Sequence, residues 1–151
     1  MTFAELCYFR KLHAAAARLY AEAFRVDPKL ADDRRAGHAY NAACSAALAG
    51  CGQGKDDPRP DDPTRAKLRG QALGWLRDEL AAWSKLLDDG APDARAQVQQ
   101  ALAHWKADPD LAGLRDPTAL TKLPEDDQRA CQVLWSAVEV VLAKARGRTS
   151  R

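Results

Sequence analysis

Small and large apolar residues recur at helical spacing in the stretch HAAAARLYAEAFRVDP, which covers residues 13–28. Ala16, Tyr20 and Ala23 are four and three residues apart, so they lie on one face of a helix. Two small residues beside one ring let a neighbouring helix approach closely and pack against Tyr20. Pro28 ends the pattern, because proline lacks the backbone donor and its ring clashes with the preceding turn. We therefore expect this stretch to be the second helix of a helical hairpin.

Apolar residues spaced three and four apart continue along the chain, alanine and leucine are abundant, and isoleucine is absent. The sequence shows no regular alternation of apolar and polar residues, which is the pattern that predicts a strand. The expected fold class is all-α, an antiparallel array of helical hairpins. The first expected helix is so long that we leave open whether it breaks near residues 11–13. No glycine or proline in that stretch signals a break. The expected helices are residues 3–26, a short turn within 28–33, 34–48, 63–88, 92–107, a short turn at 117–122, and 124–146.

The spacing Ala-x3-Tyr-x2-Ala-x4-Pro within residues 16–28 resembles the second half of a tetratricopeptide (TPR) repeat, a helix–turn–helix unit of about 34 residues. The segment AYNAACSAALAG, residues 39–50, resembles the first helix of the following repeat, with Gly50 at the family's turn glycine. The chain departs from the family by an insertion at about residues 30–34. The resemblance implies a TPR-like α-solenoid.

In TPR proteins, the first helices of successive repeats line a groove that binds peptides. Carried over to this chain, the resemblance places Tyr40, Asn41, Cys44 and Leu48 at or near groove positions, so these four are the expected partner-binding residues. The Asn41 amide can donate to and accept from a peptide backbone, and a hydrogen bond within the repeat is the equal alternative. We expect no carboxylate-binding clamp, because Tyr40 and Cys44 stand where lysine and asparagine would be needed.

The segment HWKADPDLAGLRDPTALTKLPEDDQRACQVLWSAVEVVLAKA, residues 104–145, is similar to the C-terminal helical region of planctomycete-type bacterial proteins. Those proteins combine a serine/threonine kinase domain with TPR repeats. HAAAARLYAEAF and AGHAYNAACSAALAGCGQG resemble the same proteins. The resemblance implies a non-catalytic C-terminal module of a larger signalling protein. The kinase motifs themselves, a glycine-rich loop, His-Arg-Asp and Asp-Phe-Gly, do not occur in this sequence.

We expect a single domain over residues 1–151, because a chain of this length can bury one sizeable core. Within it, residues 1–50 form TPR-like helices, residues 51–62 a loop, residues 63–146 long helices that end in a variant C-terminal cap, and residues 147–151 a basic tail. The loop CGQGKDDPRPDD is polar and unperiodic, which predicts an exposed, mobile segment. A functional loop and a tolerated insertion both fit it, and the second is preferred.

The charged residues do not indicate a nucleic-acid-binding surface, because the net charge of +2 comes from acidic and basic residues that are interspersed along the chain. No apolar run reaches the ~18 residues of a membrane span, and no signal peptide precedes the first helix. The cysteines, Cys7, Cys44, Cys51 and Cys131, are not spaced as in a disulfide-rich domain or a zinc site. We expect buried, reduced thiols in a cytoplasmic protein without a membrane or nucleic-acid partner.

No set of residues predicts catalysis. Cys51 is the most exposed thiol candidate, but no histidine lies near it in the sequence. The paired aspartates fall at helix ends and in loops, where helix capping explains them. The tryptophans fall on or beside apolar stripes, where core packing explains them better than a ligand cage. We therefore expect no enzyme, no metal and no cofactor.

The expected function is a protein–protein interaction module, a kinase-associated TPR-like scaffold with a protein or peptide partner. The alternative is a purely structural capping or dimerisation domain with no specific ligand. An apolar edge at residues 1–9, left by a missing preceding helix, leaves a homodimer through the N-terminal helix open.

Overall fold

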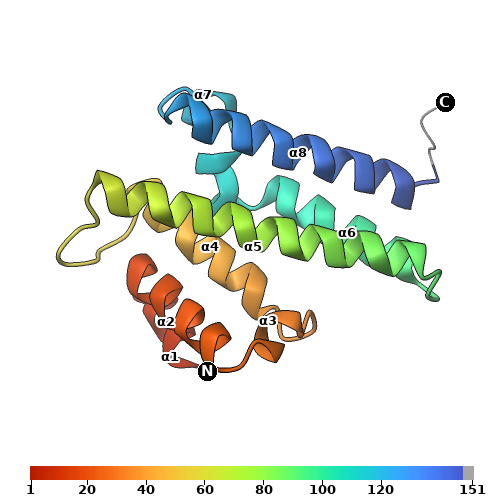
Figure 1. The fold of residues 1–151 in the computed structure, drawn as a ribbon, viewed down its shortest axis with the longest axis horizontal. Coiled ribbons are helices and arrows are strands. Elements are labelled where there is room, and N and C mark those ends of the chain that lie inside the picture. Colours follow the sequence, from red (N-terminus) through yellow and green to blue (C-terminus); the bar gives the residue numbers. More distant parts are fainter. Residues whose placement is uncertain (148–151) are drawn as a thin grey trace. The chain divides into compact units, whose positions relative to one another are not determined.

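The computed structural model describes residues 1–147, and all of its regular elements are helices (Figure 1). No strand occurs among these residues, which confirms the all-α class. Residues 148–151 of the expected basic tail lie outside the described residues. The helices, in chain order, are α1 (Phe3–Phe9), α2 (His13–Val26), α3 (Lys29–Asp32), α4 (His38–Gly50), α5 (Asp62–Asp88), α6 (Ala94–Ala107), the 3-10 helix η1 (Pro109–Leu114), α7 (Pro117–Leu120) and α8 (Glu125–Ala145).

The chain divides into two compact units, Met1–Leu76 and Arg77–Arg151, and the boundary falls inside α5. Each unit has its own buried residues and its own hydrogen bonds, and each is described by itself. The expectation of a single domain over residues 1–151 stays a prediction.

The first expected helix is interrupted at Lys11, which has a left-handed backbone with φ of 61°. The Lys11 N–H donates to the Tyr8 carbonyl at 2.9 Å, and the Leu12 N–H donates to the Cys7 carbonyl at 2.8 Å. A residue other than glycine in the left-handed conformation costs roughly 1–2 kcal/mol. The usual sequence signal for this conformation is a glycine, and the sequence has a lysine here. The prediction of one continuous helix over residues 3–26 is wrong, and the break left open near 11–13 is present.

Small residues bring α2 against both α1 and α4. Ala16 is fully buried, and Tyr20 is buried in one cluster with Ala4 of α1 and Ala42 of α4. Phe24 packs against this cluster and meets Trp75 edge-to-face, with ring centroids 5.8 Å apart. The predicted burial of Ala16 and Tyr20 against neighbouring helices is confirmed, whereas Ala23 is only half-buried and lines an apolar groove.

Helix α4 begins at His38, later than the predicted residue 34. Gly37 precedes it with φ of 69°, a conformation that glycine adopts at little cost. One carboxylate oxygen of Asp33 accepts from the backbone N–H groups of Arg35 and Ala36, both at 3.1 Å. This side-chain turn competes with helix at residues 34–37.

The loop between α4 and α5 is tied to the start of α2. Helix α2 has no capping side chain of its own at Leu12. Instead, the Asp56 carboxylate accepts from the backbone N–H groups of Ala14, at 3.1 Å, and Ala15, at 3.0 Å. The Lys55 N–H also donates to the Lys11 carbonyl at 2.7 Å. The loop, expected to be mobile, is therefore held against the α1–α2 turn.

In the second unit, an aspartate followed by a proline stands at the start of each short helix. Asp108 caps η1 by accepting from the Asp110 N–H at 2.9 Å, and Asp116 precedes the Pro117 that starts α7. Helices α6 and α8 pack on each other. The apolar residues that recur at helical spacing in both helices are buried: Val98, Leu102, Trp105, Cys131, Leu134, Val138, Val141, Leu142 and Ala145.

Candidate interaction surface

The four residues expected to bind a partner all lie on α4, but they differ in exposure. Asn41 is exposed and Tyr40 is half-buried. Cys44 is 4% exposed and Leu48 is 7% exposed, so neither offers much surface to a partner. Their role in partner binding stays a prediction.

Tyr20 joins three helices of the first unit through its hydroxyl group. Its side chain forms hydrogen bonds with Asn41 of α4 and with Thr2 at the start of α1. Burial is the main cause that raises the pKa of Tyr20 above 10.0, and the nearby Glu5 carboxylate adds to it. The Asn41 side chain therefore takes part in a hydrogen bond within its own unit, as the alternative interpretation of this residue expected.

Helix α1 turns its large apolar side chains outward. Ala4 is buried on its inner side, whereas Phe3 is 80% exposed, Leu6 38% and Phe9 68%. The three exposed residues are spaced three apart, so they form one row along the helix, which we name the α1 ridge. Such a row is the reverse of an ordinary amphipathic helix, whose large apolar side chains face the core.

The start of α1 is fixed by a reciprocal cap. The Glu5 N–H donates to the Thr2 hydroxyl at 3.2 Å, and the Thr2 N–H donates to the Glu5 carboxylate at 2.6 Å. This capping box satisfies two backbone donors that the first turn would otherwise leave unpaired. Phe3 therefore extends outward from an ordered helical turn.

An apolar groove of about 240 Å³ runs beside the α1 ridge. Leu19 of α2 and Leu30 of α3 are each 36% exposed at its edge. The Nδ1 atom of His38 is buried and has no hydrogen-bond partner within the described residues. The groove is lined by Thr2, Phe3, Ala4, Leu19, Tyr20, Ala23, Phe24, Leu30 and His38.

A second, charged groove of about 840 Å³ lies between the first half of α2, the loop and the start of α5. Arg18, Arg59 and Lys67 line it together with acidic residues of the loop. Two of these acids already serve as helix caps: Asp56 caps α2, and Asp61 accepts from the Thr64 N–H at 2.9 Å. Hydrogen bonds from Thr64 hold the pKa of Asp61 below its usual value. Two of the acidic groups that line the charged groove are thus already used as helix caps.

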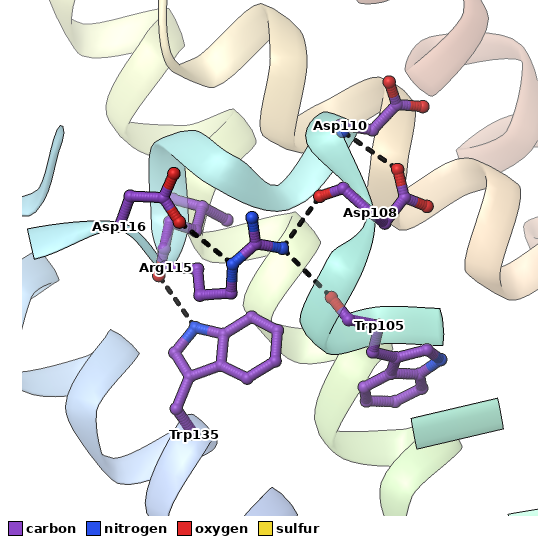
Figure 2. A network of polar contacts seen from close by, with 7 residues as sticks. Trp105, Asp108, Asp110, Arg115, Asp116 and Trp135 are labelled. Atoms are coloured by element: carbon purple, nitrogen blue, oxygen red, sulfur yellow. Dashed lines mark hydrogen bonds and ion pairs between the residues drawn. The ribbon is translucent and has the colours of Figure 1, made fainter. Parts of the chain in front are cut away.

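The second unit contains a network of polar contacts centred on Arg115 (Figure 2). Its Nη1 donates to the backbone carbonyls of Trp105 at 3.1 Å and Asp108 at 2.8 Å, and its Nε donates to the Asp116 carboxylate at 3.0 Å. The Trp135 indole N–H donates to the Leu114 carbonyl at 2.8 Å. These bonds satisfy the carbonyl groups at the end of α6 and fix the segment that follows. The network is therefore structural.

None of the cysteines, all of which lie within residues 1–147, forms a disulfide bond; Cys44 and Cys131 are buried, and Cys7 and Cys51 are half-buried. No helix within residues 1–147 combines the length and the apolarity that crossing a bilayer requires. Sequence reasoning missed the cap at Asp56 and the hub at Arg115, because their partners depend on the folded backbone and no local pattern signals them. The exposed edge at residues 1–9 was expected, and the α1 ridge is its observed form.

No protein-family model matches the chain, and no curated protein or solved structure matches it either. The likeness to TPR proteins therefore rests on the residue spacings within 16–28 and 39–50 alone.

Proposed function

We propose that this chain is a non-catalytic protein–protein interaction module. The α1 ridge carries the proposal: three large apolar side chains of one short, capped helix point away from their own unit. Burying a Phe or Leu side chain fully is worth about 1.5–3 kcal/mol. Covering the two mostly exposed phenylalanines with a partner would therefore release a substantial free energy of apolar burial.

The adjoining groove supports this proposal because it offers a concave apolar site next to a convex one. Exposed apolar patches of this kind mark interaction sites more often than isolated surface residues do. The occupant that fits is an apolar helical face, since the side chains of a second helix can pack between those of the ridge.

We further propose a TPR-like scaffold at the C-terminal part of a larger signalling protein. The TPR-like spacing in residues 16–28 and the segment 39–50 support this proposal, and so does the likeness of residues 104–145 to kinase-associated helical regions. The alternative is a purely structural capping or dimerisation domain with no specific ligand.

A peptide selection tests the proposed function and does not require the partner to be identified first. A displayed library of amphipathic helical peptides is panned against the wild-type chain and depleted on the Phe3→Glu variant. Val133→Glu is the matched control, because Val133 lies on α8 and is 68% exposed. We expect peptides that bind the wild type and Val133→Glu, but not Phe3→Glu. Failure to enrich any such peptide would favour the capping alternative.

A further inference from the structure

We infer that a second copy of this chain covers the α1 ridge, so that two α1 helices cross antiparallel about a two-fold axis. The inference rests on the proposed function and names the partner for the same surface. Two observations carry it: the symmetry of the ridge about its middle residue, and the apolar groove at one end of it.

The α1 ridge is symmetric in residue type about Leu6. Phe3 and Phe9 lie three residues before and after it. An antiparallel crossing with Leu6 on the two-fold axis places Leu6 against Leu6 and Phe3 of each copy against Phe9 of the other. Such an interface is isologous, meaning that the same patch serves both copies. Aromatic side chains that meet in this way pack favourably in offset or edge-to-face geometry.

The apolar groove supplies a seat for the incoming ring. Phe3 forms part of the groove wall, so a ring placed against Phe3 lies at the groove entrance. Apolar cavities of about 150 Å³ already take up a benzene molecule, and the groove offers about 240 Å³. Phe9 of one copy can therefore enter the groove of the other, against Leu19 and Leu30.

The exposed area fits a weak, reversible dimer. The exposed fractions of Met1, the ridge residues, Leu19 and Leu30 together equal about three and a half fully exposed side chains. At roughly 100 Å² of apolar surface each, this gives about 350 Å² per copy. Because apolar atoms make up about 57–65% of an interface, the dimer would bury roughly 1,100–1,200 Å² in total. This area lies at the lower edge of the range for stable complexes.

The acidic residue of α1, Glu5, already has a hydrogen-bond donor within each copy. The Glu5 carboxylate accepts the Thr2 N–H of the capping box. Glu5 therefore enters the crossing with a hydrogen bond to its own helix already formed.

Sedimentation velocity over a concentration series tests the inference. The wild type should shift with rising concentration from the 16.5 kDa monomer to twice that mass. Phe3→Glu and Phe9→Lys should each weaken self-association at least tenfold, because each puts a charge against an apolar ring. Both positions are mostly exposed, so neither variant should lose its fold. Val133→Glu, an equally exposed apolar-to-acid change on α8, should dimerise as the wild type does.

Mixing the two charged variants tests the antiparallel geometry itself. In a mixed dimer, the Phe3→Glu side chain of one copy faces the Phe9→Lys side chain of the other, and the second contact keeps its Phe3–Phe9 pair. The mixture should therefore dimerise where each variant alone does not. A wild type that stays monomeric, a dimer insensitive to both variants, or a mixture that stays monomeric would each overturn the inference. A monomeric wild type that still selects helical peptides would leave the proposed function standing.

Discussion

Removing the Asp56 carboxylate is expected to weaken the start of α2 specifically. In the Asp56→Ala variant, the N–H groups of Ala14 and Ala15 lose their only side-chain acceptor in the described structure. Loss of an N-cap side chain costs about 1 kcal/mol and up to about 2. Because both donors here are partly buried and meet a charged acceptor, we place the loss near the upper value, at about 2 kcal/mol.

The Asn variant separates charge from geometry. Asp56→Asn keeps one oxygen that can accept from one of the two N–H groups, but it loses the negative charge that favours a helix N-terminus. We expect it to lose about half as much stability as Asp56→Ala, roughly 1 kcal/mol. The neighbouring Asp57→Ala is the control, because Asp57 is exposed, and surface changes of this kind stay within about 0.5 kcal/mol.

Two measurements check this prediction together. Urea unfolding followed by circular dichroism gives the loss in unfolding free energy, and amide hydrogen exchange locates it. Exchange at Ala14 and Ala15 should accelerate in Asp56→Ala, whereas amides of α8 in the other unit should keep their rates. If the variant unfolds as the wild type does and the Ala14 and Ala15 amides exchange no faster, the capping argument is refuted.

Three further substitutions test other contacts. Tyr20→Phe removes the hydroxyl bonded to Asn41 and should cost about 1 kcal/mol in urea unfolding. Because folding raises the pKa of Tyr20, the protonated hydroxyl contributes to the free energy of unfolding in full below pH 10.0, and this contribution is lost as the pH rises through the folded-state pKa. Thermal melts should show this loss of stability in the wild type but not in Tyr20→Phe. Arg115→Lys loses the fork that bridges two carbonyls and a carboxylate, and should cost about 2 kcal/mol in urea unfolding. Gly50→Ala places a Cβ 2.9 Å from the Arg69 backbone nitrogen and should lower the urea midpoint by an amount equivalent to about 1–3 kcal/mol.

Local patterns were sufficient wherever one helix face decides the structure. The small residues around Tyr20 predicted the close approach of α2 to its neighbours, and the stripe through Leu134 and Val138 predicted the buried face of α8. The short turn expected at residues 117–122 corresponds to α7, Pro117–Leu120, where the proline at the first position acts within one turn of chain.

Long-range contacts were beyond such reasoning. The Asp56 cap joins residues 41 and 42 positions apart, and no spacing rule links them. The left-handed conformation of Lys11 could not be predicted from the sequence either, because lysine has no preference for that conformation. An apolar edge at residues 1–9 was expected from the TPR-like interpretation of the first helices, but the outward direction of Phe3 and Phe9 depends on the turn at Lys11.

This turn links the loop of residues 51–61 to the α1 ridge. The left-handed backbone at Lys11 turns the chain back so that α1 packs beside α2, with Ala4 inward and Phe3 outward. The Lys11 carbonyl accepts from the Lys55 N–H, and Asp56 caps α2 directly after the turn. If the loop were only a tolerated insertion, its removal would leave α2 uncapped and the turn without one of its hydrogen bonds. The loop is therefore better understood as a brace that holds the turn between α1 and α2.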